Sequence, residues 1–98
     1  MKGYLVANLD IKDQPTFQRY REQVVPLIAR YGGRYIIRGG EVENLEGRLA
    51  LKRLIVLEFP SIEAARSFYE CPEYEAIKAL RVQSTVSEVA LISGYDDA

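Results

Sequence analysis

The sequence of 98 residues contains no histidine. This absence excludes the Ser-His-Asp and Cys-His nucleophilic mechanisms, histidine metal sites and a proton shuttle based on imidazole. Any acid or base in the protein must therefore be Asp, Glu, Tyr, Lys, Arg or the single thiol. The sequence alone assigns a catalytic role to none of these side chains.

Cysteine is almost absent as well, because Cys71 is the only one. No disulfide can form within the chain, and an iron–sulfur ferredoxin is excluded because it needs several cysteine ligands. One thiol without histidine cannot complete a structural zinc site either. We therefore expect neither a metal nor a cofactor. We interpret Cys71, which has no histidine and no clear basic neighbour, as a structural residue.

An excess of charge of one sign is also missing, since the formal net charge is -1. Neither nucleic acid nor an anionic membrane is therefore an expected partner. The opening segment MKGYLVANLD has a short apolar run followed by Asn8 and Asp10, which is neither a signal peptide nor a membrane span. We expect a cytoplasmic protein. Its length and its hydrophobic content of 48% predict one domain over residues 1–98.

Hydrophobic spacing predicts four strands and two helical regions in the order β-α-β-β-α-β. The strands are expected at Gly3–Leu9, Arg34–Arg38, Leu51–Phe59 and Val86–Ser93. The first helix should begin after Asp13 and end at the glycine pair 32–33. The second should begin after Ser61, and Pro72 should break it and start a further helical turn. The segment 39–50 between the second and third strands is long for a hairpin loop.

This order is the split βαβ, or ferredoxin-like, motif of the α+β class: an antiparallel sheet with two helices on one face. The third and fourth strands carry the apolar runs LIVL at 54–57 and VALI at 89–92. A sheet with one face in water should instead alternate apolar and polar residues. The uncovered face therefore needs a partner. A second copy of the same sheet, giving a homodimer through sheet-to-sheet packing, is the simplest one.

The same order of elements occurs in RNA-recognition domains, whose third strand carries glycine and stacking aromatic residues. Here the third strand reads LKRLIVLEF, with no glycine and one terminal aromatic residue. Together with the small net charge, this composition argues against RNA binding.

Arg81 is the most informative polar residue, because it follows Ile77 by four positions and Tyr74 by seven, on the apolar stripe of its helix. An arginine that faces a core must be paired or bind an anion. Three alternatives stay open. The side chain reaches past the stripe into solvent, it pairs with an internal carboxylate, for which Glu58 is the candidate, or it holds the anionic group of a ligand.

Other polar side chains are candidates for a site shared with Arg81. Four tyrosines lie on apolar helix faces and, together with Arg81, would suit a pocket for a small, partly aromatic or carboxylated ligand: Tyr20, Tyr31, Tyr69 and Tyr74. The alternative is that they are core residues with a hydroxyl in water. Arg38 ends the second strand and Arg53 lies on the third, where each is either an edge charge in solvent or part of a pocket.

Five segments carry a resemblance to a known family: YGGRYIIRGG at 31–40, EG at 46–47, LIVLEFPS at 54–61, CPEYEAIKALR at 71–81 and SG at 93–94. They resemble the domain of unknown function 1330 family, and the resemblance extends from Tyr4 to Gly94. The EFPS segment followed by the PEY…R segment is its most specific part. Membership implies the dimeric α/β barrel superfamily, in which ferredoxin-like subunits pack their sheets face to face.

Relatives in that superfamily include cofactor-free monooxygenases, lactone isomerases and haem enzymes, which bind ligands in a cleft between sheet and helices. Their chemistry does not transfer here, because several of them use histidines that this chain lacks. The family's polar pattern implies six candidate ligand-binding residues: Tyr20, Arg38, Arg53, Glu58, Tyr74 and Arg81. We expect them to bind a small anionic or aromatic metabolite. The alternative is a cofactor-independent enzyme of monooxygenase or isomerase type, with a tyrosine or Glu58 as acid or base and Arg81 holding a carboxylate or enolate.

Overall fold

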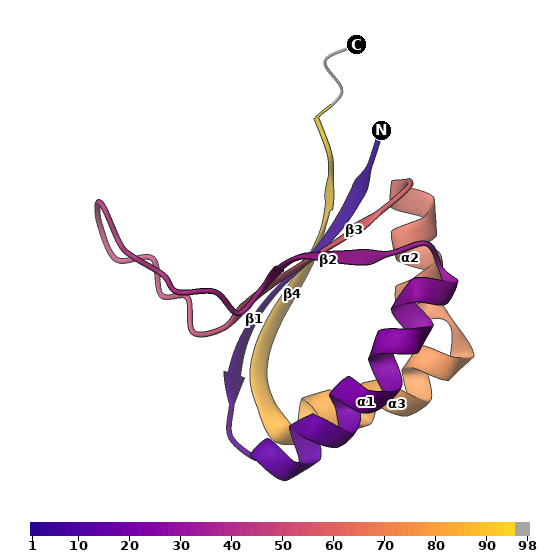
Figure 1. Cartoon of the computed structure of the whole chain (residues 1–98), viewed down its shortest axis with the longest axis horizontal. Coiled ribbons are helices and arrows are strands. Elements are labelled where there is room, and N and C mark those ends of the chain that lie inside the picture. Colours follow the sequence, from indigo (N-terminus) through magenta and orange to yellow (C-terminus); the bar gives the residue numbers. More distant parts are fainter. Residues whose placement is uncertain (96–98) are drawn as a thin grey trace.

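The computed structural model, which describes residues 1–95, consists of a four-stranded antiparallel sheet and three helices. In chain order the elements are β1 (Gly3–Ile11), α1 (Gln14–Arg30), β2 (Arg34–Arg38), β3 (Leu54–Phe59), α2 (Ile62–Glu70), α3 (Pro72–Ser84) and β4 (Thr85–Ser93). All three helices lie on one side of the sheet (Figure 1). The predicted α+β class and ferredoxin-like arrangement are confirmed.

The strands lie side by side in the order β2-β3-β1-β4, so that β1 and β3 occupy the centre of the sheet. Leu5 of β1 is paired with Leu57 on one side and Leu91 on the other. These three residues point toward the helices, because successive side chains of a strand alternate between the two faces. The same alternation places Val6 and Val56 on the opposite face.

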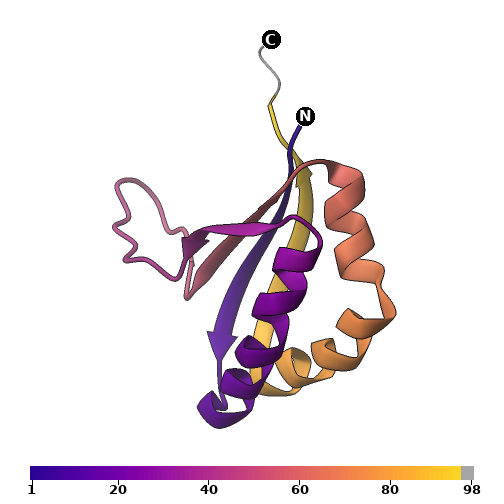
Figure 2. The same ribbon diagram turned by 45° about the vertical axis from the view of Figure 1, so that its right-hand side comes forward.

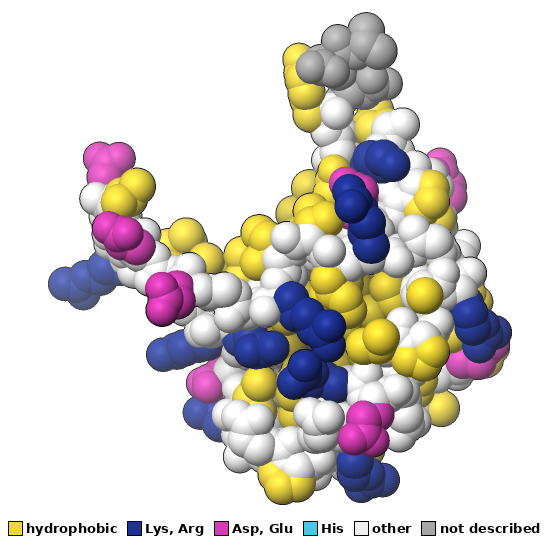
Figure 3. All heavy atoms as spheres, in the orientation of Figure 1, with side chains coloured by type: hydrophobic (Ala, Val, Ile, Leu, Met, Phe, Trp, Pro, Cys, Tyr) yellow, Lys and Arg dark blue, Asp and Glu magenta, His cyan; other side chains and the backbone are white. Residues whose placement is uncertain are grey.

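The face without helices is largely apolar, as the sequence predicts. Val6 lies between Val56 and Ala90 in the register of the sheet, and Ile37 and Ile92 lie farther out with 42% and 48% of their surface exposed. Hydrophobic side chains gather on this side of the molecule, between the projecting loop and the end of β4 (Figure 3). We call this surface the open face.

The connection from β2 to β3 is longer than predicted, because β3 begins at Leu54 rather than at Leu51. The side chain of Asn8 explains the difference. Its side-chain Nδ2 donates to the backbone carbonyl of Ala50 at a distance of 3.0 Å, and its Oδ1 accepts from the backbone N–H of Lys52 at 2.9 Å. Side-chain hydrogen bonds thus take the place of strand pairing at Ala50 and Lys52, and the segment 39–49 projects from the body of the fold (Figure 2).

The helices begin where capping residues satisfy their free N–H groups. Oγ of Ser61 accepts a hydrogen bond from the N–H of Ala64 at a distance of 3.0 Å, and Sγ of Cys71 accepts one from the N–H of Tyr74 at 3.4 Å. The break predicted at Pro72 is present, but the following segment is a full helix of 13 residues rather than one turn. Among residues 1–95, no helix combines the length and hydrophobicity needed to cross a membrane.

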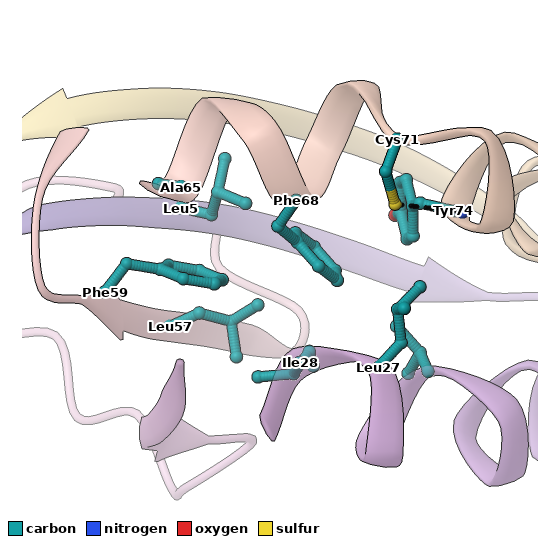
Figure 4. Packing of buried hydrophobic residues seen from close by; sticks show 10 residues of the cluster. Leu5, Leu27, Ile28, Leu57, Phe59, Ala65, Phe68, Cys71 and Tyr74 are labelled. Atoms are coloured by element: carbon teal, nitrogen blue, oxygen red, sulfur yellow. Dashed lines mark hydrogen bonds between the residues drawn. The ribbon is translucent and has the colours of Figure 1, made fainter. Parts of the chain in front are cut away.

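The hydrophobic core lies between the helices and the sheet. Phe59 of β3 and Phe68 of α2 are almost completely buried, and their ring centroids are 5.4 Å apart. Figure 4 shows these two rings facing each other beneath α2, with Leu5 and Ile28 on either side. Full burial of such side chains stabilises the fold by about 1.5–3 kcal/mol each. Several of these core residues, among them Leu5 and Phe68, also border a cavity between the sheet and the helices.

Candidate functional site

A cavity lies between the sheet and the helices α1 and α3, beside the aromatic core. Its volume is about 60 Å³. A single water needs about 10–15 Å³, so the cavity has room for several waters or a small ring. On the face shown in Figure 3, basic side chains gather beside apolar surface between β2 and α1.

Five of the six predicted site residues line this one cavity: Tyr20, Arg38, Arg53, Tyr74 and Arg81. They come from both helices and from both sides of the hairpin between β2 and β3, so that residues far apart in the sequence meet. Glu58 does not line it. Its neighbours Leu57 and Phe59 point toward the helices, and alternation therefore turns Glu58 to the open face.

The predicted pairing of Glu58 with Arg81 is wrong. The Glu58 carboxylate instead accepts hydrogen bonds from Nε of Arg34 and from the hydroxyl of Tyr4, each with a donor–acceptor distance of 3.0 Å. The hydrogen bond from Arg34, followed by that from Tyr4, holds the pKa of Glu58 below its usual value. Glu58 therefore remains an ionised surface carboxylate on the other side of the sheet.

Arg81 is buried, with only 5% of its surface exposed, so its side chain does not reach past the apolar stripe into solvent. Its Nε donates to the hydroxyl of Tyr74 at a distance of 3.3 Å, and its Nη1 donates to Oγ of Ser87 at a distance of 2.6 Å. Both partners are neutral, and among residues 1–95 no carboxylate forms an ion pair with it. A buried positive charge therefore faces the cavity without a counter-ion from the described part of the chain.

The hydroxyls of Tyr20 and Tyr74 lie 2.9 Å apart and share one hydrogen bond. Burial raises the pKa of Tyr20 well above its usual value, so this phenol stays protonated. The two hydroxyls carry two protons, and the hydrogen bond between them uses one of these. Arg81 is itself a donor to Tyr74, so it cannot accept the other proton. The other proton has no acceptor among the described residues and is available to a ligand oxygen.

Two more arginines line the cavity from the hairpin. The guanidinium of Arg38 lies 4.3 Å from the ring centroid of Tyr35, a cation–π contact that fixes its position. Nε of Arg53 is buried and has no hydrogen-bond partner within residues 1–95. Burial raises the pKa of Tyr35, and the nearby charges of Arg38, Arg21 and Arg53 oppose that rise. These arginines form a second group of positive charge around Tyr35.

Sequence reasoning missed three lining residues or partners: Arg21, Tyr35 and Ser87. Signals for two of them were present. Tyr35 lies inside the segment that resembles the family at 31–40, and Ser87 is a polar residue at an inward position of β4. Arg21 is adjacent to the apolar stripe of α1, and periodicity alone assigns such a residue to solvent.

The charge of the site is uniform. Four arginines line the cavity, while none of the described lining residues is Asp, Glu, His, Lys or Cys. Arginine stays protonated at all relevant pH values, so the positive potential persists. The described lining residues thus present hydrogen-bond donors and positive charge to the cavity. This combination is suited to holding an anion.

Comparison with known families agrees with the resemblance noted in the sequence. The model of the domain of unknown function DUF1330 matches residues 2–95. The chain belongs to the DUF1330 family. No curated protein has a matching sequence.

Solved structures share the fold of this DUF1330 protein at low sequence identity. A protein of unknown function from Rhodopseudomonas palustris is 16% identical with a TM-score of 0.75, covering 97% of this chain and 83% of the other. SnoaB, a cofactor-independent oxygenase from Streptomyces nogalater, is 13% identical with a TM-score of 0.64, covering 97% and 94%. A dimeric ferredoxin-like protein of unknown function from Jannaschia sp. is 13% identical with a TM-score of 0.63, covering 96% and 100%.

Proposed function

We propose that this protein binds a small anionic metabolite with an aromatic or apolar body in the cavity between sheet and helices. The observation that carries the proposal is the burial of Arg81 among neutral partners, in a cavity lined by further arginines and no acid. Leaving such a charge without a counter-ion is unfavourable, and an anion from solution removes that cost. The surrounding tyrosines and aliphatic side chains suit the uncharged part of the ligand.

Binding alone accounts for these residues better than proton-transfer catalysis does. A general base should have a pKa near the working pH, and the described lining residues are arginines, tyrosines and apolar side chains. The likeness to SnoaB, an oxygenase, favours a second candidate, an enzyme that needs no cofactor. In that case the arginines and the free tyrosine proton would stabilise a negatively charged oxygen of a substrate that is already ionised.

A homodimer is the second part of the proposal. The open face exposes apolar side chains such as Ile37 and Ile92 around the central row of Val6, Val56 and Ala90. A contiguous apolar surface of this kind marks an interface. The fold is shared with a protein from Jannaschia sp. described as dimeric. A second copy that packs its own open face here would bury both surfaces at once, by an isologous contact.

Light scattering after gel filtration tests the dimer. The mass measured by scattering should be twice the chain mass of 11.1 kDa. Val56→Glu places a charge at the centre of the open face and should shift the equilibrium toward monomer. Val25→Glu, on the exposed side of α1, is the matched control and should remain dimeric. A wild-type monomer at micromolar concentration would contradict the proposed packing.

Isothermal titration calorimetry with benzoate tests the binding site, and benzamide is the matched neutral ligand. Benzoate should bind the wild type, and benzamide should bind far more weakly because it brings no negative charge to the arginines. The double variant Arg53→Met/Arg81→Met should lose benzoate binding. The double variant Arg19→Met/Arg66→Met changes two exposed arginines and should retain it. Equal binding of benzoate and benzamide by the wild type would refute the proposal. An equal loss of benzoate binding in the two double variants would refute it as well.

A further inference from the structure

The arginines of the cavity fall into two groups at opposite ends of one row of the sheet. Continuing the register of β1 with β3 pairs Arg53 with Leu9, whose N–H donates to the Arg53 carbonyl over 2.9 Å. On the other side, Leu9 is paired with Ser87 of β4. The row Arg53–Leu9–Ser87 therefore crosses three strands on the face that points toward the helices.

Arg81 occupies the far end of this row, because its Nη1 is bound to Oγ of Ser87 over 2.6 Å. Arg53 occupies the near end, and Arg38 of β2, which is paired with Ile55, lines the cavity beside it. Two strand spacings separate the backbones of Arg53 and Ser87, which is roughly 10 Å. Anchor points this far apart suit two separate anionic groups better than one compact anion.

The space between the two groups is apolar. Leu9 lies at its floor and is buried to 3% exposure, with Ala7 and Ile55 beside it in the lining. Aromatic residues from the helices form the roof, where Tyr20 and Tyr74 meet edge to face at a centroid distance of 6.4 Å. A flat, uncharged body fits between such a floor and such a roof.

We infer that the cavity selects a ligand with two anionic groups at opposite ends of a flat apolar body. This inference rests on the proposed function and specifies its ligand class. One anionic group is held by Arg81 together with the free proton of the Tyr20–Tyr74 pair. The other is held by Arg38 and Arg53, whose buried Nε then gains the acceptor that the described chain does not provide.

Titration calorimetry with three benzoate derivatives tests the inference at neutral pH. Terephthalate carries carboxylates at opposite ends of its ring, and 4-methylbenzoate has the same shape with one carboxylate. Isophthalate has the charge of terephthalate, but its carboxylates are not opposed. The wild type should bind terephthalate roughly 10- to 100-fold more tightly than 4-methylbenzoate, the gain expected from one further charged contact. Isophthalate should bind more weakly than terephthalate.

Variants at either end assign the gain to the two arginine groups. In the double variant Arg38→Met/Arg53→Met and in Arg81→Met, the preference for terephthalate over 4-methylbenzoate should fall to about twofold, the statistical advantage of having two equivalent carboxylates. If one variant fails to fold, the other still carries the test. Equal binding of terephthalate and 4-methylbenzoate by the wild type, or of terephthalate and isophthalate, overturns the inference and leaves the proposed function intact. Failure of all three acids to bind overturns the proposed function itself.

Discussion

The variant Arg81→Met removes a buried guanidinium while it keeps an unbranched apolar side chain that fills much of the same space. In the folded protein this guanidinium donates to the hydroxyls of Tyr74 and Ser87. The substitution therefore leaves two neutral hydroxyls without one of their partners. It leaves no ionised acid behind, because Glu58 is bound by Arg34 on the other face.

The expected change in the free energy of unfolding is small because two effects oppose each other. Each lost hydrogen bond to a charged donor costs about 1.5–3 kcal/mol. Removing a buried charge also removes its desolvation penalty, which is several kcal/mol. We expect Arg81→Met to lie within about 1.5 kcal/mol of the wild type. Breaking a buried ion pair instead costs about 3–5 kcal/mol.

Urea unfolding followed by far-ultraviolet circular dichroism measures this change. Wild type and variant must be compared at equal protein concentration, because the stability of a dimer depends on it. Arg19→Met, on the exposed side of α1, is the control for replacing an arginine by methionine. A loss of 3 kcal/mol or more in Arg81→Met alone, in the range of about 3–5 kcal/mol for a broken buried pair, would show that the guanidinium has an acidic partner.

Two further predictions concern stability, and a third concerns ligand binding. The hydrogen bond from Arg34 keeps the pKa of Glu58 below its ordinary 4.5. The ionised carboxylate therefore stabilises the fold above pH 4.5, and this contribution is lost as the pH falls through the lowered pKa. Glu58→Gln should flatten the acid side of a stability–pH profile. Gly32→Ala should cost about 1–2 kcal/mol in urea unfolding because φ is 79° there, whereas Gly40→Ala should be nearly neutral. Cys71→Ser keeps a side-chain acceptor at the start of α3, so calorimetry should find benzoate binding unchanged.

The fold was predictable because apolar spacing, caps and turns agree along most of the chain. The helix stripes correctly identified the inward direction of Tyr20, Tyr74 and Arg81, since a period of 3.6 residues defines one face. The start of β3 was not predictable. It depends on the side chain of Asn8 binding Ala50 and Lys52, a contact between segments far apart in the sequence.

The error at Glu58 has a physical lesson. The prediction placed it near Arg81 because both lie close to the second helical region in the sequence. Strand alternation, applied from Leu57 and Phe59, would have turned it to the open face instead. Which acid neutralises which arginine depends on three-dimensional contacts, and Arg34 reaches Glu58 only because β2 and β3 are paired.

Nuclear magnetic resonance of the arginine Nε–Hε groups tests the central claim most directly, because each arginine reports separately whether an anion approaches it. On addition of terephthalate, whose two carboxylates can reach both arginine groups, the resonances of the cavity arginines Arg53 and Arg81 should shift and saturate together, with one dissociation constant. Those of the exposed Arg19 and Arg66 should not follow that curve. Shifts confined to the exposed arginines, or the absence of saturating shifts at Arg53 and Arg81, would contradict an anion site between sheet and helices.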